Sequence, residues 1–151
     1  GHTNEDEYRH MLAQAEQSRY RIEFLGKLAQ SDLAQEYRRA DVFVLPSFFE
    51  GLPLVVVEAL ACGCMAVVTD LPGIRPWIEA QAPDAPVIFV EPPRIVNADE
   101  PVAEDLPAFE RRLAKAIESA LRVPPGRCDL AHLSWDALAA RVLDVCADLV
   151  R

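Results

Sequence analysis

Residues 41–63 read DVFVLPSFFEGLPLVVVEALACG, and this stretch predicts a strand, a turn and a helix in succession. Residues 41–46 are apolar at four successive positions, as in a strand that is covered on both faces. Residues 54–62 are expected to form the helix, which Pro53 opens at an early position and Gly63 closes. A buried strand that leads directly into a helix is typical of parallel α/β sheets.

The rest of the chain continues this alternation of short apolar runs and helical patterns. Further strands are expected over residues 21–26, 65–69 and 86–90, and further helices over residues 31–39, 108–122 and 133–150. Residues 73–81 are expected to form a short helix or a turn region. Residues 91–107 are rich in proline and acids, which indicates an ordered excursion or a mobile loop. Four strands separated by helices predict an α/β fold with a Rossmann-like parallel sheet flanked by helices. Ligands of such sheets bind outside the carboxyl ends of the strands.

Composition narrows the class of protein. The chain has 151 residues, the size of one domain, and 51% of them are hydrophobic, which is typical of a globular protein. Its net charge of -9 argues against nucleic-acid binding, because so acidic a surface repels phosphate backbones. The four cysteines have neither zinc-site nor disulfide-framework spacing, so we expect small buried side chains in a reducing cytosol. Trp77 and Trp135 are interpreted as packing residues.

Two carboxylates flank the start of the predicted helix at residues 54–62. Glu50 lies in the turn, and Glu58 lies about 7.5 Å along the helix axis at about 1.5 Å per residue. Between them, the first N–H groups of the helix lack helical partners and favour an anion, and Gly51 leaves room for close approach. This arrangement suits a sugar that is joined through a diphosphate to a nucleoside. The alternatives are that Glu50 is a solvated loop acid and that Glu58 is the exposed edge of the helix.

The E-x7-E spacing within EGLPLVVVEALACG resembles the signature of retaining GT-B glycosyltransferases of the group 1 type, often called family four. The resemblance extends to RIEFLGKL, ADVFVLPS, AVVTDLPG and LSWDALA, and so covers most of the chain. It implies that residues 1–151 form a single nucleotide-sugar-binding domain, the C-terminal half of a GT-B fold. The N-terminal acceptor domain is then expected to be absent, and the fragment alone is expected to be inactive.

The resemblance also implies roles for individual residues. Glu50 would bind hydroxyls of the donor hexose as the candidate catalytic residue, and Glu58 would hold the ribose hydroxyls. Lys27 and Leu28 would meet the nucleobase through backbone atoms. Four further residues would direct backbone N–H groups at the sugar and the diphosphate: Gly51, Leu52, Leu54 and Val55. No metal ion and no cofactor are expected, because basic side chains and helix dipoles would carry the leaving diphosphate.

The implied partners are a nucleotide sugar and the N-terminal domain of the same chain, in the cytoplasm. No transmembrane segment is predicted, and peripheral membrane association would belong to the missing domain. A non-catalytic Rossmann-like nucleotide-sugar-binding module and a related GT-B epimerase or phosphorylase are the alternative functions.

The chain departs from the family pattern after the strand expected at residues 65–69. The family often has Gly-Gly followed by a Glu there, whereas this chain has Pro72 and Gly73 followed by Arg75. Asp70, at the start of this region, is interpreted as a turn-forming residue. The basic pair that grips the diphosphate in the family corresponds to a region ahead of Gly1.

Overall fold

The computed structural model describes residues 5–97, 99–124, 126 and 128–149. These residues belong to two compact units, of which the first ends at Gln30 and the second begins at Ser31. The first unit contains helix α1 (Glu5–Gln17) and an irregular segment that follows it. Within this unit, the ring of Tyr8 meets the ring of Phe24 edge-on, with 6.4 Å between the centroids.

The strand expected at residues 21–26 is absent, and this prediction is wrong. The segment is irregular, and its apolar side chains Ile22, Phe24 and Leu25 are exposed. A strand is stable only where a neighbouring strand exchanges backbone hydrogen bonds with it. Within the described residues, this segment has no such neighbour. The local apolar pattern was therefore insufficient to specify a strand.

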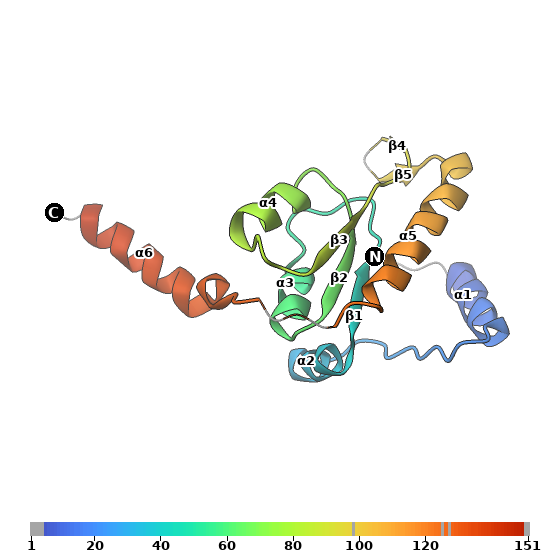
Figure 1. Ribbon diagram of the computed structural model, residues 1–151, viewed down its shortest axis with the longest axis horizontal. Helices are drawn as coiled ribbons and strands as arrows, with labels where there is room; N and C mark the ends of the chain where they lie inside the picture. The colour runs from blue at the N-terminus through green and yellow to red at the C-terminus, as the bar shows by residue number, and fades with distance from the viewer. Residues whose placement is uncertain (1–4, 98, 125, 127, 150–151) are drawn as a thin grey trace. The chain divides into compact units, whose positions relative to one another are not determined.

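The core of the second unit is a parallel three-stranded sheet of β1 (Val42–Leu45), β2 (Met65–Thr69) and β3 (Val87–Val90). The strand order is β1-β2-β3, with Leu45 opposite Val68 and Thr69 opposite Val90. All five residues of β2 are buried, since this strand has neighbours on both edges and helices on both faces. Because the strands are parallel, their carboxyl ends share one edge, the upper one in Figure 1.

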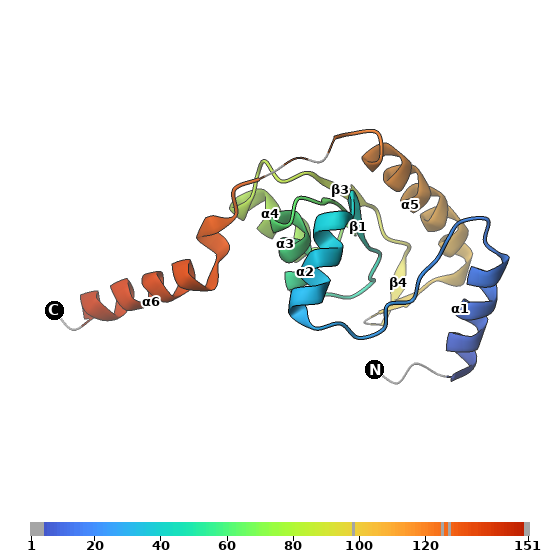
Figure 2. The same cartoon turned by 90° about the horizontal axis from the view of Figure 1, so that it is seen from below.

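Helices cover both faces of this sheet (Figure 2). Helices α3 (Leu54–Ala61) and α4 (Ile74–Gln81) pack on the face that presents Ala66 and Val68. Helix α5 (Leu106–Ala120) packs on the other face, against Met65 and Val67. Helix α2 (Gln30–Arg39) contributes Tyr37 to a buried cluster with Ala59 of α3 and Cys64. The predicted α/β class, a parallel sheet flanked by helices, is confirmed.

The segment after β3 is an ordered excursion, the first of the two alternatives for residues 91–107. It forms a short antiparallel hairpin of β4 (Ile95–Val96) and β5 (Glu100–Pro101), followed by the 3-10 turn η1 (Ala103–Asp105). Arg94, just before β4, donates two side-chain hydrogen bonds to Asp105 at the end of η1, at 2.7 and 3.1 Å. This contact holds the pKa of Asp105 below its ordinary value. Helix α5 then begins at Leu106, and Pro107 is well tolerated in its first turn.

The C-terminal part comprises the 3-10 turn η2 (Ala131–Leu133) and helix α6 (Trp135–Leu149). Trp77 packs against the core as predicted, but the packing role predicted for Trp135 is wrong, because this side chain is 76% exposed. The cysteines also divide: Cys64 is buried, whereas Cys146 is exposed, contrary to the expectation. Among the described residues, each helix is too short or too polar to span a lipid bilayer.

Candidate functional site

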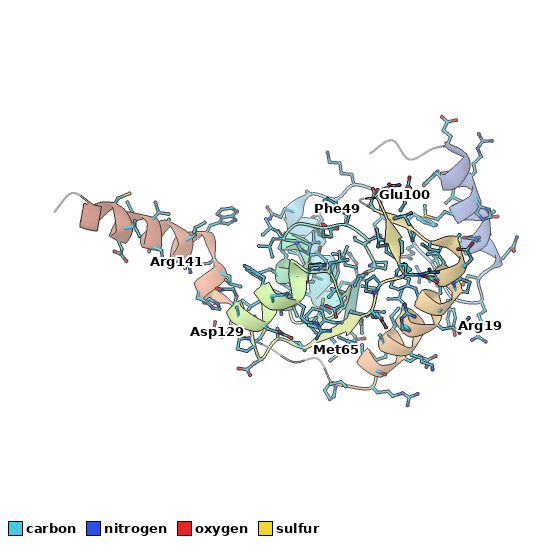
Figure 3. All side chains as sticks on the ribbon, turned by 90° about the horizontal axis from the view of Figure 1, so that it is seen from above. Arg19, Phe49, Met65, Glu100, Asp129 and Arg141 are labelled. Carbon is cyan, nitrogen blue, oxygen red and sulfur yellow. The ribbon has the colours of Figure 1, made fainter. Side chains whose placement is uncertain are left out.

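The loop between β1 and α3 carries the predicted donor-binding residues at the carboxyl edge of the sheet. Phe48 anchors this loop by packing its ring edge-on against Phe109 of α5, with 5.3 Å between the centroids. The next side chain, Phe49, is 67% exposed and is labelled in Figure 3. Glu50 is half-buried, and Gly51 is exposed. The loop is thus held at Phe48, and the residues beyond it lie at the surface.

The amino end of α3 faces the same edge. Pro53 is the N-cap residue, is buried, and makes no side-chain capping bond. Its carbonyl accepts the Val56 N–H at 3.0 Å, so the first turn is tight. The first N–H groups of a helix point out of its amino end, and here Leu54 is exposed and Val55 is half-buried. Such an end favours an anionic group.

The backbone conformation of Gly63, at the carboxyl end of α3, confirms the predicted end of the helix. Gly63 has φ +100, a left-handed conformation that glycine adopts without strain. Its N–H donates to the Leu60 carbonyl, and the Cys64 N–H donates to the Ala59 carbonyl, both at 3.0 Å. These two bonds form a Schellman motif, which ends the helix and turns the chain into β2.

Glu58 lies in the fifth position of α3 and is half-buried, so it is not simply the exposed edge of the helix. The pKa of Tyr37, on α2, depends on where the Glu58 carboxylate lies. Burial is the larger cause that raises the pKa of Tyr37, and the negative charge of Glu58 is the next. The Glu58 carboxylate therefore lies within electrostatic reach of the Tyr37 hydroxyl, a relationship that the sequence did not predict.

A second polar group forms where β2 ends. Arg75, in the first turn of α4, donates from Nε to Asp70 Oδ1 at 2.8 Å and from a terminal nitrogen to Asp70 Oδ2 at 2.6 Å. The same guanidinium lies 4.2 Å from the centre of the Phe89 ring on β3. Its hydrogen bonds to Asp70 are the main cause that raises the pKa of Arg75. Asp70 is therefore an ion-pair partner as well as a turn residue.

Lys27 and Leu28 belong to the first unit, so their role at the nucleobase stays a prediction. The glycine turn before them is confirmed, since Gly26 has φ +64. Lys27 is exposed and Leu28 is half-buried. The structure brings Glu50, Gly51, Leu52, Leu54, Val55 and Glu58 together as one loop and the helix that follows it.

A comparison with protein families identifies the family to which this chain belongs. A model of the family described as glycosyl transferases group 1 matches residues 1–105 of the 151. The chain belongs to this family. Membership agrees with the parallel sheet and with the carboxylate spacing around α3. It confirms the resemblance on which the residue roles rest, whereas the roles themselves stay predictions.

Curated glycosyltransferases are similar to the chain. An N,N'-diacetylbacillosaminyl-diphospho-undecaprenol alpha-1,3-N-acetylgalactosaminyltransferase of Campylobacter jejuni is 46% identical over 52 residues, which are 34% of this chain and 13% of that protein. A D-inositol 3-phosphate glycosyltransferase 2 of Catenulispora acidiphila is 32% identical over 124 residues, with 82% of this chain and 27% of that protein covered.

An alpha-maltose-1-phosphate synthase of Mycobacterium tuberculosis is 26% identical over 151 aligned residues, with 93% of this chain and 36% of that protein covered. The alignments therefore cover between 13% and 36% of the length of these three relatives. The matches place it in a family of glycosyl-transferring enzymes.

Proposed function

We propose that this chain is the donor-binding part of a retaining glycosyltransferase that transfers a hexose from a nucleotide-diphosphate sugar. The observation that carries the proposal is the exposed amino end of α3 at the carboxyl edge of the sheet. Glu50 precedes this end and Glu58 lies within the helix. Family membership supports glycosyl transfer as the reaction class.

The diphosphate would lie at the amino end of α3. Backbone N–H groups bind anions there without a basic side chain, so the net charge of -9 is no obstacle. These groups stabilise the negative charge that develops on the leaving diphosphate during transfer. The N–H groups assigned to this task are those of Gly51, Leu52, Leu54 and Val55.

The two carboxylates would hold the two sugars of the donor. Each carboxylate accepts hydrogen bonds at two oxygens, which suits neighbouring hydroxyls. Glu50, as the candidate catalytic residue, would orient the hexose so that its anomeric carbon faces the acceptor. Glu58 would hold the ribose, and the backbone of Lys27 and Leu28 would contact the nucleobase.

The acceptor is assigned to an N-terminal domain of the same polypeptide, and any peripheral contact with a membrane is assigned to that domain too. No metal ion or cofactor takes part in the proposed transfer, which occurs in the cytoplasm. The chain by itself is proposed to bind the donor without completing transfer.

Gly51→Ala tests the site with little risk to the fold. A methyl group at Gly51 meets no atom within 4 Å, so the substitution projects into open space. We expect unchanged thermal stability and weaker binding of the best ligand in a panel of uridine, guanosine and adenosine diphosphate hexoses. Binding is measured by ligand-observed NMR on this chain. If Gly51→Ala binds the ligand as tightly as wild type does, the amino end of α3 is not part of the donor site.

Glu58→Gln tests the ribose contact. Loss of a charged acceptor weakens binding by about tenfold or more, and free nucleoside diphosphates should lose as much affinity as complete nucleotide sugars. Glu110→Gln on α5 is the matched control, because Glu110 is an exposed helical acid on the opposite face of the sheet. Equal affinities of wild type and Glu58→Gln for every nucleotide would refute the ribose role.

A further inference from the structure

The turn after β2 approaches the donor-binding loop at one point. A side chain at Gly73 would place its Cβ 3.4 Å from the carbonyl oxygen of Gly51. Among the described residues, no other atom beyond Gly73's own neighbours comes within 4 Å of that position. The Gly51 carbonyl therefore points towards Gly73. Gly73 has φ -85, so its conformation does not require glycine, and a Cβ there would lie at the short limit of ordinary van der Waals contact with that oxygen.

The geometry of the Gly51–Leu52 peptide relates this approach to one of the N–H groups assigned to the donor. The Gly51–Leu52 peptide is trans, so its carbonyl and the Leu52 N–H lie in one plane and point in opposite directions. A carbonyl that points towards Gly73 directs the Leu52 N–H away from the turn. Leu52 is one of the residues assigned to the diphosphate. The 71–73 turn thus lies beside the carbonyl of the peptide whose N–H is assigned to the diphosphate.

The Asp70–Arg75 ion pair holds this turn at both ends. The Asp70 N–H donates to the Val90 carbonyl at 2.8 Å, which attaches Asp70 to β3. Arg75 then grips both carboxylate oxygens of Asp70, in a two-point geometry that resists rotation. Its guanidinium also stacks on Phe89. Residues 71–73 are therefore closed into a short loop between two fixed points.

The charges argue against a direct role for Arg75 in binding phosphate. Its guanidinium pairs with Asp70 at 2.6 Å and lies 3.6 Å from a carboxylate oxygen of Glu79. One positive charge is thus shared by two negative charges. An anion that approached Arg75 would meet a group that is already neutralised. The pair is suited to holding the backbone rather than to binding the donor.

We propose that Asp70 and Arg75 are positioning residues, which orient the Leu52 N–H for the donor diphosphate by holding the 71–73 turn beside the Gly51 carbonyl. The inference rests on the proposed function of the α3 end and goes beyond it, because it assigns a role to the turn where this chain departs from the family pattern. It also explains how Arg75 contributes to the site without touching the ligand.

Asp70→Ala separates positioning from charge, because the two predict opposite signs. Removal of one negative charge alone would strengthen binding of a diphosphate. Loss of the positioning contact instead weakens it by about threefold to tenfold, the equivalent of one ordinary hydrogen bond. The matched control is Asp105→Ala, which breaks the similar two-point pair with Arg94 and removes the same charge. The control should bind as tightly as wild type or more tightly.

The measurements are ligand-observed affinities of this chain for uridine, guanosine and adenosine diphosphates, and the backbone amide spectrum without ligand. In Asp70→Ala the Leu52 amide resonance should move, and in Asp105→Ala it should not. Gly73→Val pushes on the Gly51 carbonyl while leaving the ion pair intact, so it should also move that resonance and weaken binding. This second variant keeps the test valid if Asp70→Ala fails to fold.

The possible failures are distinguishable. If wild type binds a nucleotide and Asp70→Ala and Gly73→Val bind it as tightly, the positioning inference is overturned and the proposed function stands. An unmoved Leu52 resonance in the folded variants overturns it as well. If wild type binds no nucleotide, the proposed function fails for this chain, and the Leu52 resonance alone decides whether the ion pair orients that peptide.

Discussion

The ring of Phe48 packs edge-on against the ring of Phe109, and this contact ties the donor-binding loop to helix α5. Phe48 lies two residues before Glu50, whereas α5 begins far along the chain at Leu106. Helix α5 otherwise covers the sheet face opposite to α3. One aromatic pair therefore couples the loop to the layer on the other side of the sheet.

Phe109→Ala should destabilise the fold by about 3–5 kcal/mol, the usual cost of removing a buried phenylalanine ring. Phe109 is 4% exposed and packs on both the sheet and Phe48. The control is Leu121→Ala. Leu121 is suitable because it lies 62% exposed after the end of α5. Urea unfolding should show a change below about 1 kcal/mol for the control.

Gly63→Ala should cost about 1–2 kcal/mol, because a residue with a Cβ is strained in the left-handed conformation that ends α3. No atom lies within 4 Å of the added methyl group, so backbone strain is the whole effect. Gly51→Ala is the matched control, since its Cβ is equally unobstructed and its φ is not positive. Equal unfolding midpoints for the two variants would contradict this reading of Gly63.

Glu58→Gln should lower the pKa of Tyr37, because it removes a negative charge that disfavours the tyrosinate. Ultraviolet absorbance of the tyrosinate measures the midpoint, with Tyr37→Phe as the baseline for the other two tyrosines. Glu36→Gln should leave the midpoint in place, since Glu36 is not among the charges that raise the Tyr37 pKa. A Tyr37 midpoint unaffected by Glu58→Gln would show that the two side chains are further apart than the structure indicates.

The raised pKa of Tyr37 also predicts the sign of the alkaline dependence of stability. The native state keeps the phenol proton at a pH where the unfolded chain has lost it. The contribution of Tyr37 is therefore complete below its ordinary pKa of 10.0 and decreases as the pH rises through the higher native value. In urea titrations, the free energy of unfolding of wild type should therefore fall more steeply with rising alkaline pH than that of Tyr37→Phe.

Thiol alkylation should follow burial. Cys64 is fully buried, and its thiol donates to the Tyr37 carbonyl at 3.0 Å. Burial raises the pKa of this thiol, which leaves less of the reactive thiolate. Mass spectrometry after iodoacetamide treatment should find Cys146 modified first and Cys64 modified only in urea. Equal rates for Cys64 and Cys146 in the native protein would contradict the buried position.

Elements whose signals are local could be predicted from the sequence. The apolar runs at β1, β2 and β3 are short and bounded by turn residues, so their limits differ from the prediction by no more than one residue at either end. Pro53 and Gly63 marked the ends of α3 because each acts through its own backbone. Residues 21–26 carry a similar apolar run, but a strand also needs a partner, which a single segment cannot specify.

Contacts between distant residues could not be predicted in this way. Nothing in the sequence indicates that Glu58 lies within electrostatic reach of Tyr37, that Phe48 meets Phe109, or that the turn at Gly73 lies beside the Gly51 carbonyl. Arg75 was recognised only as a departure from the family pattern, and its pairing with Asp70 required the geometry of the turn.

The sequence by itself determined the α/β class, the position of α3 and the family signature around Glu50 and Glu58. Periodicity, capping and spacing are properties of consecutive residues, so they can be read without the fold. The tertiary structure alone decided which helices cover each face and which side chains support the donor-binding loop. Those choices depend on how the elements pack around one shared core, where residues far apart in the chain compete for the same contacts.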